Sequence, residues 1–429
     1  MIFKTHSPLS ISTCIMITLP LNTAYIPKNL QHIDPVPVDT TAPLSWFART
    51  GYYVVGNKIF RHKVYAMQEA TRQRIKPTDV IWVFNNDVYD SLDWKNVRSI
   101  SLRDIYRLRA QQLREKYDYL MLSFSGGGDS TNVLDSFVLN NIRLDEVVVY
   151  WPHKHTSGKY TASPDTAATN FLSEWDYNIE PKLKWLEKVS PQTKITILDW
   201  TEKLDIHEPD EDIVELSPHH NYLGYKRYQA VDTLLLERQT QHKNYAFVTG
   251  INPAFPWQLG RHLFTMFFEG PTCSYGSDYT SRGLHRNVEF FYWTPDMPEI
   301  VSVQCHALLA ALKADPKALT LVPKWGLTGP VAGNQPNGEH LRQWTKRVLY
   351  PTYDHQNLQV DKNSSPLIAP EWYSWFYANK DAEEIVQPHR SGITSHQNLI
   401  DPSFFVFKNN QVNAYHMYKS KLYYVGDLS

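Results

Sequence analysis

The chain has 429 residues, 42% of them hydrophobic, so it is long enough to bury a large core in one or two domains. Its 43 lysines and arginines nearly balance 44 aspartates and glutamates, and a net charge of -1 excludes a global attraction to nucleic acid or to a charged membrane surface. Three distant cysteines, Cys14, Cys273 and Cys305, exclude a disulfide-rich secreted scaffold and a paired zinc motif, so we expect a cytoplasmic protein.

The first 100 residues are expected to form an irregular arm followed by a small α+β unit. Ile11–Leu21 is apolar but short and broken by Pro20, so it does not fit a signal peptide, and Met16 is an alternative start to Met1. No segment approaches the roughly 20 apolar residues that span a bilayer, so we expect no membrane partner. Tyr52–Phe60 contains a Gly-Asn turn between apolar runs, which predicts a β-hairpin.

Residues 101–313 are expected to form the main domain. Ser101 followed by Asp104 is typical of a helix start, and a helix is predicted from there to about Tyr117. Short apolar runs then alternate with helical patterns, and the expected strands lie near 119–124, 146–151, 194–200, 245–250 and 288–293. This alternation predicts an α/β fold, in which a parallel sheet carries helices on both faces.

Residues 314–429 are expected to form a loop-rich extension. Lys324–His340 is rich in glycine, proline and asparagine, which predicts a long loop. Helical patterns follow near 342–350 and 371–379, and the last 25 residues contain short strand-like runs.

The sequence SGGGDS, Ser125–Ser130, stands between a predicted strand and a predicted helix. Glycines lack Cβ atoms, so successive backbone N–H groups can converge on an anion at a helix start, where the helix dipole also favours negative charge. No Gly-Lys-Ser/Thr closes the loop and the G-x-G-x-x-G spacing is absent, so neither a Walker A motif nor a dinucleotide fingerprint explains it. The pattern predicts a different phosphate-binding loop.

This loop resembles the S-G-G-x-D-S loop of the PP-loop ATP pyrophosphatases, which include asparagine synthetase, GMP synthetase, argininosuccinate synthetase and tRNA-modifying adenylating enzymes. The similarity covers about residues 117–313 and is strongest to the synthetase domain of asparagine synthetase. It implies a Rossmann-like fold of the adenine nucleotide alpha hydrolase type. It also implies that ATP is cleaved to AMP and pyrophosphate, so that a carboxylate or carbonyl acceptor is activated for amidation.

The resemblance assigns roles to particular residues. Pyrophosphate would be held by the six residues of the loop: Ser125, Gly126, Gly127, Gly128, Asp129 and Ser130. Asp129 and Ser130 would also be catalytic, and Asp129 would bind Mg²⁺, which prefers carboxylate oxygen and neutralises charge on the leaving group. Tyr150, at the end of the second strand, and Gly250, at the end of a later strand, would contact the nucleotide.

The chain departs from asparagine synthetase at two places. Asn252 and Pro253 stand where relatives often carry an acidic pair, so a second magnesium ligand would come from elsewhere. Residue 2 is Ile2 and not the cysteine nucleophile of a glutaminase domain, so we expect no glutamine hydrolysis on this chain.

Other functions remain open. One is adenylation-dependent modification of RNA or a nucleobase, including thiolation, for which Cys273 is the placed cysteine. Another is a nucleotide sensor without turnover. The candidate cations for holding phosphates are Lys226, Arg227, Arg261, Lys346 and Arg347. The acceptor, a small molecule or RNA, and the oligomeric state are not specified by the sequence.

Overall fold

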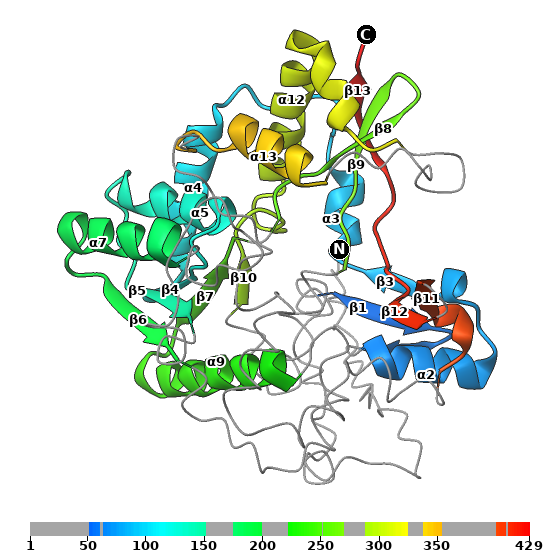
Figure 1. Cartoon of the computed structure of the whole chain (residues 1–429), viewed down its shortest axis with the longest axis horizontal. Coiled ribbons are helices and arrows are strands. Elements are labelled where there is room, and N and C mark those ends of the chain that lie inside the picture. Colours follow the sequence, from blue (N-terminus) through cyan, green and yellow to red (C-terminus); the bar gives the residue numbers. More distant parts are fainter. Residues whose placement is uncertain are drawn as a thin grey trace, which may run out of the picture.

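The computed structural model describes residues 51–60, 63–151, 175–199, 222–250, 252–269, 288–324, 338–353, 400–408 and 411–429. Its centre is a five-stranded sheet with the order β10-β7-β4-β5-β6, in which all neighbours are parallel (Figure 1). The strands are β4 (Tyr119–Ser123), β5 (Glu146–Tyr150), β6 (Lys194–Leu198), β7 (Tyr245–Thr249) and β10 (Val288–Phe290). The predicted α/β class with a parallel sheet is confirmed.

Helices cover both faces of this sheet, because alternate strand residues point to opposite sides. The helices concerned are α4 (Leu102–Lys116), α5 (Gly128–Val138), α7 (Glu180–Val189) and α9 (Tyr222–Gln241). In β4, Leu120 and Leu122 join the core that contains α4, α5 and α7. Met121, between them, joins a second core with Val231 and Leu235 of α9. Figure 1 shows α9 on one side of the sheet and the other three helices on the opposite side.

The chain order of the strands creates a topological switch point. The chain runs outward from β4 to β5 and β6, and then returns to place β7 on the other side of β4. Ser123 and Thr249 are paired at the carboxyl ends of β4 and β7, where the connections leave in opposite directions. Ligands of open α/β sheets collect at this kind of position. The glycine loop begins just beyond it.

Helix α4 begins as the sequence predicts. The Ser101 side chain accepts from the Asp104 backbone N–H at 3.1 Å, which caps the first turn. Farther along, buried Arg109 donates at 3.0 Å both to the Glu289 carboxylate and to the Phe290 carbonyl. Because Glu289 and Phe290 belong to β10, this ion pair fixes α4 to the edge of the sheet.

The N-terminal unit contains the predicted hairpin. Its elements are β1 (Tyr52–Val55), β2 (Lys58–Phe60), α2 (Lys63–Gln73), η1 (Pro77–Asp79), β3 (Ile81–Val83) and α3 (Asn86–Ser91), with sheet order β2-β1-β3. The buried Glu69 carboxylate accepts from Lys58 and Arg72 at 2.8 Å, and also from Gln73. These bonds, led by the one from Arg72, lower the pKa of Glu69 to about 2.

The rest of the described chain supplies the remaining helices and strands. Its elements are η2 (Trp175–Ile179), β8 (Pro256–Leu259), β9 (His262–Thr265), α12 (Glu299–Ala314), η6 (Pro316–Leu321), α13 (Gly338–Leu349), η8 (Pro402–Phe404), β11 (Phe405–Lys408), β12 (Gln411–Tyr415) and β13 (Tyr423–Asp427). Strand β13 pairs with β9, and β9 pairs with β8, in a separate antiparallel sheet. The predicted C-terminal strands and the first helix of the extension are confirmed.

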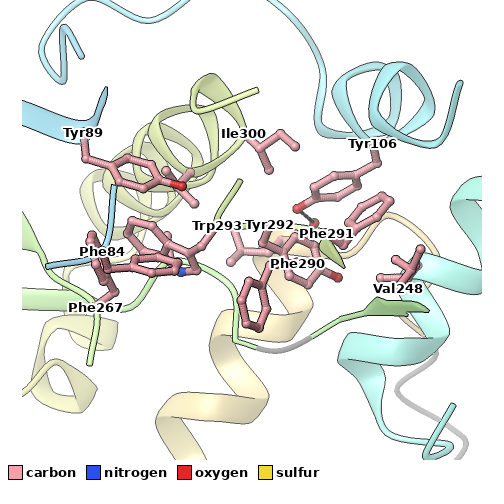
Figure 2. Close-up of a cluster of buried hydrophobic side chains, with 14 of the residues drawn as sticks. Phe84, Tyr89, Tyr106, Val248, Phe267, Phe290, Phe291, Tyr292, Trp293 and Ile300 are labelled. Atoms are coloured by element: carbon pink, nitrogen blue, oxygen red, sulfur yellow. Dashed lines mark hydrogen bonds between the residues drawn. The ribbon is translucent and has the colours of Figure 1, made fainter. Parts of the chain in front are cut away.

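An aromatic cluster joins these parts (Figure 2). The Phe267 ring lies 4.5 Å from the Trp293 ring and 4.9 Å from the Phe84 ring, measured between centroids. Buried Glu269 connects the N-terminal unit with the C-terminal segment through hydrogen bonds. Its carboxylate accepts from Tyr53, from Lys63 and, at 2.8 Å, from the Tyr418 backbone N–H. Contacts therefore cross both sequence boundaries, near residues 100 and 313.

Several expectations fall outside the described residues. They include the N-terminal arm with Met1 and Met16, most of the glycine-rich loop 324–340, the helix near 371–379, Cys273, and the side chains of Lys226 and Arg227. Within the described ranges, no helix combines the length and apolarity needed to cross a bilayer.

Candidate functional site

The glycine loop turns the chain sharply from β4 into α5. Gly126 has φ +72°, a left-handed conformation that favours glycine. Buried Ser130 holds the turn closed: its hydroxyl accepts from the Ser125 backbone N–H at 3.2 Å and donates to the Gly127 carbonyl at 3.1 Å. The serine predicted as a catalytic residue thus has a structural role in the loop.

The start of α5 has no side-chain cap. Gly127 occupies the N-cap position in extended conformation, with φ -70° and ψ 160°, and it has no side chain to accept from the first-turn N–H groups. Ser125 is exposed, Gly127 and Asp129 are partly exposed, and Gly126 and Gly128 are buried. The open side of the loop therefore carries a hydroxyl, unsatisfied helical N–H donors and one carboxylate. Such a start of a helix favours an anion.

Gly250 lies behind the loop. A Cβ atom at this position would stand 2.9 Å from the Asp129 carbonyl oxygen and 2.9 Å from Val133 Cγ2. Close packing of β7 against the first turn of α5 thus accounts for this glycine without any ligand. Two residues farther along the chain, Asn252 adopts the left-handed region at φ 40°.

Tyr150 lies at the same edge of the sheet. Its hydroxyl donates to Ser123 Oγ at 2.8 Å, which links the ends of β5 and β4 just below the loop. Its ring lies 6.5 Å from Phe247, on the side of the sheet that faces α9. The loop, Tyr150 and Gly250 thus lie at the carboxyl ends of neighbouring strands, and their contacts with a nucleotide stay a prediction.

Two tyrosines that the sequence analysis did not select hold Asp129. Tyr350, which follows α13, donates its hydroxyl to Asp129 Oδ1 at 2.8 Å. Tyr292, which follows β10, donates to the Asp129 carbonyl oxygen at 3.1 Å and accepts from Asn132 Nδ2 at 2.9 Å. The two rings stack with centroids 6.0 Å apart. The C-terminal extension thus contributes directly to the loop.

Both phenols are kept as neutral donors. Burial, and then the negative charge of Asp129, raise the pKa of Tyr350 well above its usual value. Burial also raises the pKa of Tyr292, with smaller contributions from Tyr106 and Asp129. Each therefore keeps its proton, and can donate to Asp129, throughout the physiological pH range.

Asp129 fits the role of a magnesium ligand. Its Oδ1 is oriented by Tyr350, while its Oδ2 has no hydrogen-bond partner among the residues that the structure describes. Mg²⁺ is commonly held by one or two carboxylates together with substrate phosphates, and hydrogen bonds to a ligating carboxylate fix its orientation. Across the described ranges no group of three histidine, cysteine or acidic side chains is arranged to hold a metal.

The cations suggested by the sequence lie elsewhere. Arg261 is in the turn between β8 and β9, and Lys346 and Arg347 are in the last turn of α13. A cavity adjoins the loop at Gly126 and Gly128. Lys182 of α7 lines this cavity, whereas none of these three cations does. Lys182 has no signal in the sequence, because its proximity depends on how α7 packs against α5.

No protein-family model and no curated protein matches the chain.

Proposed function

We propose that the chain is an ATP-dependent adenylating enzyme of the PP-loop type, with the adenine nucleotide alpha hydrolase variant of the Rossmann-like fold. It cleaves ATP to AMP and pyrophosphate and activates a carboxylate or carbonyl acceptor for amidation, as asparagine synthetase does. The observation that carries the proposal is the uncapped start of α5 beyond β4, at the topological switch point of a parallel sheet.

The loop supports binding of the leaving pyrophosphate. The first-turn N–H groups of α5 and the exposed Ser125 hydroxyl are donors suited to phosphate oxygens. No lysine closes the loop as in a Walker A motif. Donors held on the β and γ phosphates leave the α phosphate as the centre that the acceptor oxygen attacks, with pyrophosphate as the leaving group.

Asp129 would hold Mg²⁺, which neutralises charge that develops on pyrophosphate as it leaves. Tyr350, which lies 221 positions from Asp129 in the sequence, orients the carboxylate for this role. Ser130 keeps the loop in its bound shape before a nucleotide arrives, so little ordering is needed on binding.

The test is incubation of the full chain with α-labelled ATP, Mg²⁺ and candidate acceptors from a cell extract, followed by separation of the nucleotides. We expect labelled AMP, with pyrophosphate in equal amount and no accumulation of ADP. The Asp129→Ala variant is expected to lose this activity. Asp104→Ala, which removes another acidic residue from the first turn of a helix, is the matched control and should keep it. Labelled ADP as the main enzyme-dependent product would contradict the mechanism.

A second candidate is a nucleotide sensor without turnover. It is favoured by the single carboxylate at the loop and by Asn252 in place of an acidic residue. ATP binding that depends on Asp129, without pyrophosphate release in any extract, would select this alternative.

A further inference from the structure

A cavity of 270 Å³ opens beside the glycine loop. It is bounded by the outer side of α5, by η2 with the start of α7, and by residues 350–353 that follow α13. Gly126 and Gly128 form its boundary with the loop. Its volume is close to the lower end of the roughly 300–1,000 Å³ of small-molecule sites, so it suits one ring system better than a whole nucleotide.

One wall is a π-helical turn, η2, a rare local structure that is frequent at functional sites. It is packed tightly on the loop, because a Cβ atom at Gly126 would stand 2.6 Å from Ile179 Cγ1. The turn presents Tyr177 to the cavity. The Tyr177 side chain is 40% exposed and makes no hydrogen bond or ring contact with the described residues, so its face is open to a planar ligand.

The cavity is also lined by an oriented amide oxygen. Asn132 is 3% exposed and lines the cavity. Its Nδ2 donates to the Tyr292 hydroxyl at 2.9 Å, which fixes the orientation of the amide, whereas its Oδ1 has no hydrogen-bond partner within the described ranges. Solvent reaches this oxygen, so it can accept from a ligand that donates an N–H or O–H group.

The charges in the cavity balance. Among its described lining residues only Lys182 and Asp135 are charged, and they form an ion pair at 2.6 Å. Thr352 donates to the other oxygen of Asp135 at 2.7 Å. Because no positive charge is left over, the cavity does not suit a phosphate or another multiply charged anion. Lys182 Nζ still has donors for a neutral carbonyl or ring nitrogen, as a primary ammonium carries three.

We propose that this cavity binds an uncharged nucleobase beside the phosphate loop. The base stacks on Tyr177, donates an exocyclic or ring N–H to Asn132 Oδ1, and accepts from Lys182. The inference rests on the proposed function for the position of the phosphates, and it names the substrate class that the adenylation site would serve. The base belongs to a separate acceptor that binds together with ATP.

The experiment is calorimetric titration of the full chain with adenosine, guanosine, cytidine and uridine, each without and with saturating ATP and Mg²⁺. We expect at least one nucleoside to bind, and Tyr177→Ala to weaken this binding by about tenfold or more, the scale of losing one stacking ring. Tyr177 is 40% exposed and makes no hydrogen bond or ring contact with the described residues, so we expect this variant to fold normally. Asn132→Ala should weaken binding as well. Tyr424→Ala, which removes a partly exposed tyrosine of β13 outside the cavity, is the matched control.

Competition with ATP tests whether the base is that of a separate acceptor. Nucleoside binding that persists at saturating ATP supports the inference, whereas displacement of the nucleoside by ATP overturns it. Failure of all four nucleosides to bind at millimolar concentration, or equal binding by Tyr177→Ala and the parent, overturns the inference. Release of pyrophosphate from ATP in the same preparation would then leave the proposed function standing. Nucleoside binding without any ATP binding would contradict the proposed function alone.

Discussion

Replacing Gly127 with serine separates the stability of α5 from its use as an anion site. Gly127 already has the extended conformation of an N-cap residue, and the nearest atom to an added Cβ, Ser125 Oγ, is 3.4 Å away. A serine hydroxyl at this position would accept from the N–H groups of the first turn. The free energy of unfolding is therefore expected to stay the same or to rise by a few tenths of a kcal/mol.

Nucleotide binding should change in the opposite direction. The N–H groups capped by the new hydroxyl are the donors that the proposal assigns to pyrophosphate, and a hydrogen bond to a charged group contributes about 1.5–3 kcal/mol. Loss of one such bond predicts ATP affinity about 10- to 150-fold weaker. Urea denaturation and calorimetric ATP titration measure the two quantities on the same preparation. Unchanged ATP affinity in a stably folded Gly127→Ser protein would refute the assignment of the loop.

Four further outcomes are expected. Gly250→Ala places Cβ roughly half an ångström inside van der Waals contact with the backbone of α5, so urea denaturation should show about 1–3 kcal/mol lower stability; an unchanged midpoint would argue against this packing. Tyr350→Phe removes the donor to the loop carboxylate, so the Mg²⁺ concentration for half-maximal ATP binding should rise about tenfold, whereas an unchanged value would show that the bond has no such role. Glu69 has a lowered pKa, so its contribution to stability is complete above about pH 4.5 and is lost as the pH falls toward 2. Glu69→Gln should therefore lower the free energy of unfolding by about 1–2 kcal/mol at neutral pH, a value reduced because Arg72 is exposed to solvent. The same variant should flatten the acid limb of a stability–pH curve. Burial raises the pKa of Cys305 to about 12, so peptide mass spectrometry should find this thiol unalkylated in the native protein and alkylated after unfolding.

The sequence predicted those features whose cause is local. The apolar runs that form β4, β5 and β7 are flanked by turn residues, and the Ser101 cap depends on residues three positions apart. The loop was recognised for the same reason, since Ser125–Ser130 is contiguous. Helix α5 begins at Gly128, inside the loop, a start that the sequence pattern does not indicate because glycine is a poor helix former.

Other parts of the site depend on contacts between distant segments. Tyr350 and Tyr292 lie 221 and 163 positions from Asp129, and the sequence gives no sign that either meets the loop. Gly250 has a packing role that only the approach of β7 to α5 explains. The hairpin β8–β9 was also missed, although Gly260 with φ +58° lies at its turn. Its strands are four residues long, too short for alternation to stand out.

The pairing of β9 with β13 has a consequence for synthesis of the protein. His262 of β9 and Asp427 of β13 are bonded although they are 165 residues apart. At roughly 5–20 residues per second, a ribosome needs roughly 8–33 s to make the intervening chain. During that time β9 presents an unpaired edge that other chains can join. Strand β13 therefore covers this edge of β9 only late in synthesis, and loss of β13 would leave the edge exposed to other chains.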